Sequence, residues 1–205
     1  MATEDTPDHP MKNRFRGYYP VVIDVETGGL DPEYHALLEI AAITLTLNDQ
    51  GQLVPYHKQS ISICPYDEEA IVEEAIKINK IDIHDPNRGA LEEKQALTKI
   101  FQMIRKDQKE HQCVRSVLVG HNAAFDLNFV HQGAKRCGIK RNPLHPFTCF
   151  DTATLAAVAY GQTVLKLAIK AIGIEYNDQK AHRALYDTEL TSALFCAIAN
   201  QWPQD

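Results

Sequence analysis

The sequence predicts an α/β fold in which a mixed five-stranded sheet is flanked by helices. Two observations carry this prediction. Three strand-like segments follow one another near the N-terminus, and helical segments then alternate with single strands. The chain has 205 residues, 44% of them hydrophobic and 23% charged, which is typical of a folded protein and excludes a disordered or collagen-like chain.

The first three predicted strands form a meander. Residues 19–26 are a short apolar run rich in valine, and residues 38–47 are another. A turn-like sequence at 48–51 leads to a third strand, in which polar and apolar residues alternate over 60–63. Because the connections are short, we expect these strands to pair antiparallel.

Helices and two further strands follow. The predicted helices lie at 69–78, 91–111, 124–137, 152–160, 163–172 and 183–201, and the remaining strands at 116–120 and 147–150. No repeat or linker interrupts the chain from residue 14 to residue 202. We therefore expect one domain over 14–202, preceded by a disordered tail at 1–13.

Composition also bears on location and partners. No segment approaches the roughly 18 consecutive apolar residues of a membrane span, so we expect no membrane contact and a cytoplasmic protein. Five widely spaced cysteines without a C-x-x-C pair favour reduced thiols over a zinc site. The formal net charge is −6, and an acidic balance taken alone disfavours a nucleic-acid partner.

Asp24 and Glu26 end the first predicted strand. Strand side chains alternate, so residues two apart point to the same face and these carboxylates converge. Two buried like charges are costly unless a cation compensates them, and hard oxygen ligands favour magnesium or manganese. Both could instead face solvent where the strand ends, which is the commoner place for carboxylates.

Two later segments add acidic residues and a histidine. Asp126 follows the buried strand 116–120 at the start of a helix, from where it could reach the first pair, although a helix dipole also favours Asp there. His182 and Asp187 are five residues apart, and a continuous helix would turn them about 140° from each other. We expect His182 on a loop and Asp187 on the helix that follows. Together these residues are the set used for two-metal hydrolysis of a phosphodiester, with histidine suited to accept a proton from the attacking water.

Three blocks resemble the exonuclease motifs of the DEDD superfamily, in its histidine-containing branch. They are Asp24-Val25-Glu26-Thr27, His121-Asn122-Ala123-x-Phe125-Asp126 and His182-x-x-x-x-Asp187. Further blocks, such as Arg14-Phe15-Arg16-Gly17 and Lys140-Arg141-Asn142-Pro143, resemble the ribonuclease T family within that branch. This resemblance extends from Arg14 to Trp202.

The resemblance implies a ribonuclease-H-like fold and a 3′-to-5′ exoribonuclease. Such an enzyme removes nucleoside monophosphates from single-stranded 3′ ends, trims stable RNA such as transfer and ribosomal RNA, and works as a homodimer; DNA is the open alternative substrate. It uses two Mg²⁺ ions, for which Mn²⁺ can substitute. The family's metal ligands correspond to Asp24, Glu26, Asp126 and Asp187, and its general base to His182.

The resemblance also implies substrate contacts. Phe125 and Phe147 match positions that stack on terminal bases, and Glu74 matches a carboxylate that reads the end base, whereas core packing is the alternative for both phenylalanines. Leu30 and Ile78 stand where aromatic residues are expected, so base preference is expected to differ. A basic patch that guides RNA to the other subunit corresponds to Arg14, Arg16, Lys109, Arg115 and Lys140.

Three other functions remain open. An oligoribonuclease shares the chemistry but lacks the blocks at 14–16 and 140–143. A DNA proofreading exonuclease is expected to carry a C-terminal docking extension, and only three residues follow Trp202 here. A non-catalytic nucleic-acid-binding module is expected to lack at least one metal ligand, and all are present.

Overall fold

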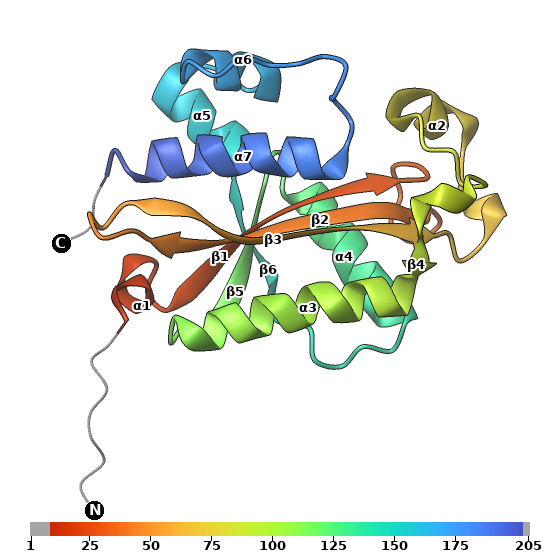
Figure 1. Cartoon of the computed structure of the whole chain (residues 1–205), viewed down its shortest axis with the longest axis horizontal. Coiled ribbons are helices and arrows are strands. Elements are labelled where there is room, and N and C mark those ends of the chain that lie inside the picture. Colours follow the sequence, from red (N-terminus) through yellow and green to blue (C-terminus); the bar gives the residue numbers. More distant parts are fainter. Residues whose placement is uncertain (1–8, 203–205) are drawn as a thin grey trace, which may run out of the picture.

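The computed structural model describes residues 9–202. Over this range it contains a mixed sheet of six strands in the order β4-β3-β2-β1-β5-β6 (Figure 1). The strands are β1 (Tyr18–Thr27), β2 (Leu37–Leu47), β3 (Leu53–Cys64), β4 (Leu91–Glu92), β5 (Arg115–Gly120) and β6 (Leu144–Asp151). The α/β class is confirmed. The sheet exceeds the five strands predicted because the first two residues of the segment 91–111 pair with the end of β3 and form β4.

Strand β1 occupies the centre of the sheet. It pairs antiparallel with β2, which pairs antiparallel with β3, so the predicted meander is confirmed. On its other side β1 pairs parallel with β5, and β5 with β6. Val21, Val22 and Ile23 are buried, as expected for a strand that is covered on both faces. Because β1 and β5 are parallel neighbours, their C-terminal ends lie at the same edge of the sheet.

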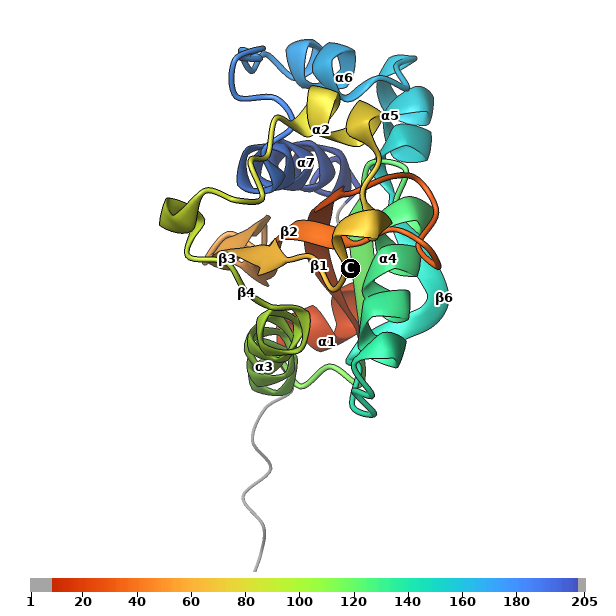
Figure 2. The same cartoon turned by 90° about the vertical axis from the view of Figure 1, so that its right-hand side faces the viewer.

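Helices cover both faces of the sheet. Figure 2 shows α7 on one face, α3 and α4 on the other, and α5 and α6 beyond α7. The helices are α1 (Pro10–Arg14), α2 (Glu73–Asn79), α3 (Glu93–Glu110), α4 (Ala124–Arg136), α5 (Thr152–Tyr160), α6 (Leu165–Ala171) and α7 (Ala184–Ala199), with 3-10 turns η1 (Glu68–Ala70) and η2 (Pro86–Arg88). In the part of the chain that is described, no single helix meets the length and hydropathy expected of a membrane span; α5 and α6 meet them only as a pair bent by 45°.

Two predicted segments differ from the structure near the chain's start and middle. The tail predicted at 1–13 is wrong from Pro10 onward, because α1 begins there, with His9 as its N-cap and Met11 fully buried; residues 1–8 lie outside the described range. The helix predicted at 69–78 is divided into η1 and α2 by the extended residues Ile71 and Val72. The burial of Met11 explains why a helix forms at Pro10–Arg14, and composition alone could not predict this burial.

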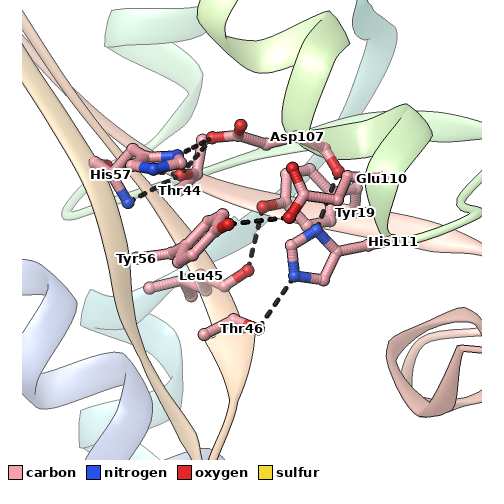
Figure 3. Close-up of polar contacts among 9 residues, drawn as sticks. All are labelled: Tyr19, Thr44, Leu45, Thr46, Tyr56, His57, Asp107, Glu110 and His111. Atoms are coloured by element: carbon pink, nitrogen blue, oxygen red, sulfur yellow. Dashed lines mark hydrogen bonds and ion pairs between the residues drawn. The ribbon is translucent and has the colours of Figure 1, made fainter.

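A buried polar cluster joins the meander to α3 (Figure 3). Asp107 of α3 is fully buried and its Oδ2 accepts hydrogen bonds from Thr44 Oγ1 at 2.7 Å and His57 Nδ1 at 3.0 Å. Thr44 pairs with Val21 near the start of β1, whereas Glu26 is near its end. The cluster and the carboxylate edge described below therefore lie at opposite ends of the sheet.

Candidate active site

The C-terminal end of β1 presents two carboxylates on one face. Asp24 and Glu26 are half-buried, whereas Val25 between them is buried on the other face. The backbone N–H of Val25 donates to Oδ1 of Asp126 at 3.0 Å, which fastens the first turn of α4 to β1. The structure thus brings Asp126 beside the pair from β1.

The turn from β5 into α4 is tight. A Cβ at Gly120 would lie 3.0 Å from the Cα of Ala123 and 3.2 Å from Oδ2 of Asp126, which is tighter than ordinary van der Waals contact, so a larger residue would displace its neighbours. Asn122 adopts a left-handed conformation with φ 66°, and its N–H donates to Oδ1 of Asp151 at 3.1 Å. These contacts direct the buried carboxylate of Asp126 toward β1.

His182 and Asp187 complete the cluster from the start of α7. His182 lies outside the helix with φ 61°, and its N–H donates to Oδ2 of Asp187 at 2.9 Å. Ligand atoms of Glu26, His182 and Asp187 all lie within 4.8 Å of one another. Oδ1 of Asp187 is buried and accepts no hydrogen bond from any residue between 9 and 202, so this oxygen is available to a cation.

Burial raises the pKa of every carboxyl group in the cluster, and repulsion from neighbouring carboxylates raises those of Asp24 and Glu26 further. Burial raises the pKa of Glu26 to about 8, with further increases from Asp187 and other nearby carboxylates. Burial likewise raises the pKa of Asp126 to about 7 and the pKa values of Asp24 and Asp187 above their ordinary range. A divalent cation would reverse these shifts, because it favours the charged form of each ligand. The oxygen-rich donor set and the unpartnered Asp187 oxygen therefore fit a hard divalent cation.

A cavity of about 510 Å³ adjoins Glu26. Four predicted substrate residues line it, namely Leu30, Glu74, Ile78 and Phe125. Leu30 and Ile78 are 83% and 58% exposed, so their side chains are open to a ligand. Phe147 does not line this cavity: it is 79% exposed on β6, and its ring packs edge-on against His145. The structure thus assembles four of these five predicted residues.

The predicted basic patch divides into exposed and buried residues. Arg16, Lys109 and Lys140 are exposed. Arg14 is only 7% exposed and its Nη2 donates to the carbonyl oxygen of Ala199 at 2.6 Å. Nη2 of half-buried Arg115 donates to the carbonyl oxygen of Leu144 at 2.7 Å. Both arginines join neighbouring elements here, a packing role that the sequence did not indicate.

Sequence reasoning missed Glu39 and Arg183. Glu39 of β2 lies directly opposite Glu26 in the register, and its charge raises the pKa values of Glu26 and Asp24. Arg183, which follows His182, lowers the pKa of Glu26. A signal for Glu39 was present, because this glutamate interrupts an otherwise apolar strand.

The model of the exonuclease family matches residues 21–195, which is most of the chain. The chain belongs to this exonuclease family. Ribonuclease T of Haemophilus influenzae is 52% identical over 199 residues, covering 97% of this chain and 87% of that protein. Ribonuclease T of Marinobacter nauticus is 50% identical over 202 residues, covering 98% of this chain and 91% of that protein. The exonuclease described here is accordingly a member of the ribonuclease T group and a hydrolase of phosphodiester bonds.

Solved structures share the exonuclease fold. A zinc-bound complex of E. coli exonuclease I with single-stranded DNA has a TM-score of 0.68 at 19% identity; the match covers 91% of this chain but 41% of that one. A 3′-exonuclease that recognises a histone mRNA stem-loop has a TM-score of 0.70 at 15% identity, covering 89% of this chain and 64% of that one. At these identities the likeness concerns the fold, and it agrees with the ribonuclease-H-like architecture predicted.

Proposed function

We propose that this exonuclease is a metal-dependent 3′-to-5′ exoribonuclease that releases nucleoside monophosphates from single-stranded 3′ ends, through one domain that extends from α1 to Trp202. The observation that carries the proposal is the carboxylate cluster beside an open cavity, with His182 close to two of its members. Relatives at about 50% identity are named ribonuclease T, which favours RNA over DNA.

The four carboxylates Asp24, Glu26, Asp126 and Asp187 would hold two Mg²⁺ ions, with Mn²⁺ as a substitute. Bound there, the ions supply positive charge to the attacking and leaving oxygens of the phosphodiester. Asp187 would use its unpartnered Oδ1 as the ligand atom, since its Oδ2 already accepts the N–H of His182. The imidazole of His182 would accept the proton of the attacking water.

The cavity next to Glu26 would receive the terminal nucleotide. Phe125 offers an aromatic ring for stacking, whereas Leu30 and Ile78 offer apolar contact without a π face. Glu74 lines the same cavity and can accept hydrogen bonds from a base. We expect weaker base stacking here than in an enzyme with aromatic residues at positions 30 and 78.

The proposal includes a homodimer that trims stable RNA such as transfer and ribosomal RNA precursors. Exposed Arg16, Lys109 and Lys140 are the cations available to contact the RNA backbone outside the catalytic cavity. The cytoplasmic location stays a prediction. Sedimentation at several protein concentrations tests the dimer, which a purely monomeric profile would exclude.

The decisive experiment compares the purified wild-type protein with Asp24→Asn on single-stranded RNA carrying a 3′ label, in the presence of Mg²⁺. We expect labelled mononucleotide as the first product of the wild type and at least a hundredfold slower release by the variant, since one metal ligand is lost. Equal rates, or labelled products longer than one nucleotide, would exclude the proposed chemistry. The same assay on single-stranded DNA separates a ribonuclease from a DNA exonuclease.

A further inference from the structure

The connection between α6 and α7 carries His182 near its end (Figure 1). Its middle is fastened to both helices. Lys166 of α6 donates to both carboxylate oxygens of Asp178, at 2.6 and 2.8 Å. The N–H of Asn177 donates to the hydroxyl of Tyr186, in the first turn of α7, at 2.7 Å. The connection is thus held to α6 and α7 shortly before His182.

His182 itself has an unfavourable backbone conformation. Its φ of 61° lies in the left-handed region, which residues with a Cβ rarely adopt. The hydrogen bond from its N–H to Asp187 is a local contact that holds this conformation. Only three residues separate His182 from Asp178, and Gln179 and Lys180 among them are exposed. The position of the imidazole therefore depends on the contacts of Asn177 and Asp178 before His182 and on the hydrogen bond from His182 to Asp187.

We propose that Tyr186 and Lys166 are positioning residues for the reaction, because they keep the imidazole of His182 beside Glu26 and Asp187. The inference rests on the proposed function, in which His182 accepts the proton of the attacking water. Neither positioning residue touches the reacting atoms in this arrangement. When a fastening is lost, the connection spends less time with His182 in place, and the rate of the chemical step falls while the metal ligands remain intact.

The two fastenings differ in strength. Lys166 and Asp178 are an exposed ion pair, with side chains 38% and 69% exposed, and such pairs contribute little because solvent screens them. The hydroxyl of Tyr186 instead satisfies a backbone N–H, and its ring packs edge-on against Tyr176 at 6.0 Å. We therefore expect the loss of the Tyr186 hydroxyl to matter more than the loss of the Lys166 charge.

The test uses Tyr186→Phe and Lys166→Gln in the whole chain of 205 residues. Steady-state assays on 3′-labelled single-stranded RNA give kcat and KM, and single-turnover assays give the rate of the chemical step. Loss of one hydrogen bond shifts the equilibrium between placed and displaced His182 by about two- to tenfold, so Tyr186→Phe should lower kcat by up to that factor and Lys166→Gln by about twofold or less. KM and the affinity for Mn²⁺, measured by calorimetry, should stay within about twofold of wild type because the cavity and the ligands are untouched.

Two matched controls lie outside the connection between α6 and α7. Tyr56→Phe removes a tyrosine hydroxyl that donates to Glu110 at 2.7 Å, and Lys58→Gln removes an ion pair with Glu189 at 2.7 Å. Both should retain the wild-type kcat. The double variant Lys166→Asp with Asp178→Lys exchanges the two charges of the Lys166–Asp178 ion pair. Its kcat should be higher than that of either single variant, Lys166→Asp or Asp178→Lys.

The inference is overturned if Tyr186→Phe keeps the wild-type kcat, or if its loss of rate is matched by an equal loss of Mn²⁺ affinity or by unfolding at the assay temperature. Failure of the proposed function has a different result, because the wild type would then release no mononucleotide or His182→Ala would be as fast as wild type. An inactive His182→Ala together with a fully active Tyr186→Phe would reject the positioning role alone.

Discussion

Replacing Asp107 by Ala removes the centre of the polar cluster that joins α3 to the meander (Figure 3). The carboxylate accepts two hydrogen bonds on Oδ2, from Thr44 and His57. Bonds to a charged group are worth about 2 kcal/mol each, so their loss costs about 4 kcal/mol. Oδ1 of Asp107 is buried with no partner among residues 9–202, and removing that atom returns about 2 kcal/mol. The expected net loss is about 2 kcal/mol of unfolding free energy.

Urea unfolding at neutral pH measures this loss, and the slope with urea should not change, because the variant still folds to the same surface. Asp107→Asn should cost less than Ala, because its amide oxygen can still accept from Thr44. Nuclease activity under folding conditions should equal that of the wild type, since the cluster and the carboxylate site lie at opposite ends of β1. A cost below about 0.5 kcal/mol for Ala, or a loss of activity in the folded variant, would refute this reasoning.

Three further predictions concern the site and its surroundings. Burial raises the pKa of Glu26 to about 8 and that of Asp126 to about 7, so the contribution of these two carboxyl groups to the stability of the metal-free protein is fully present below about pH 4 and is lost as the pH rises through 7 to 8. Mn²⁺ should therefore raise the melting temperature more at pH 8 than at pH 6, and an equal rise at both would contradict this. Leu30→Phe adds a ring to the exposed wall of the cavity, and stacking worth about 1 kcal/mol or more should lower KM for single-stranded RNA at least about fivefold in steady-state assays. Arg14→Ala should lower the unfolding midpoint in urea because the hydrogen bond to the carbonyl oxygen of Ala199 is lost. Arg16→Ala should leave the midpoint unchanged and weaken RNA binding in a salt-dependent way, because Arg16 is exposed. Identical midpoints for the two variants would refute the packing role of Arg14.

The sequence predicted the direction of side chains correctly where the two-residue repeat of a strand or the 3.6-residue turn of a helix determines it. The spacing of Asp24 and Glu26 placed them on one face, and the spacing of His182 and Asp187 excluded one continuous helix; the structure has both features. Apolar runs likewise predicted the meander. These predictions depend on alternation and helical rotation, which neighbouring residues determine by themselves.

Contacts between distant segments could not be predicted in this way. The bond from Val25 to Asp126 joins residues 101 positions apart, and the buried guanidinium of Arg14 bonds a carbonyl 185 positions away. The pairing of Glu39 with Glu26 depends on the register of β1 and β2, which no single segment determines. Such features follow from tertiary packing, and for this reason Arg14, which the sequence predicted in an RNA-contacting patch, is buried.

The distribution of charge resolves the conflict between an acidic chain and a nucleic-acid substrate. The net charge of −6 includes four carboxylates that gather at the end of β1 and the starts of α4 and α7, where their raised pKa values already indicate a need for positive charge. Divalent ions at that site would offset this negative charge and attract the phosphodiester to the point of cleavage. The exposed cations Arg16, Lys109 and Lys140 belong to α3 and to loops outside this cluster, so they can contact an RNA backbone without neutralising the carboxylates proposed to bind metal. An average over the chain hides both surfaces, and therefore the acidic balance is no argument against RNA as the substrate.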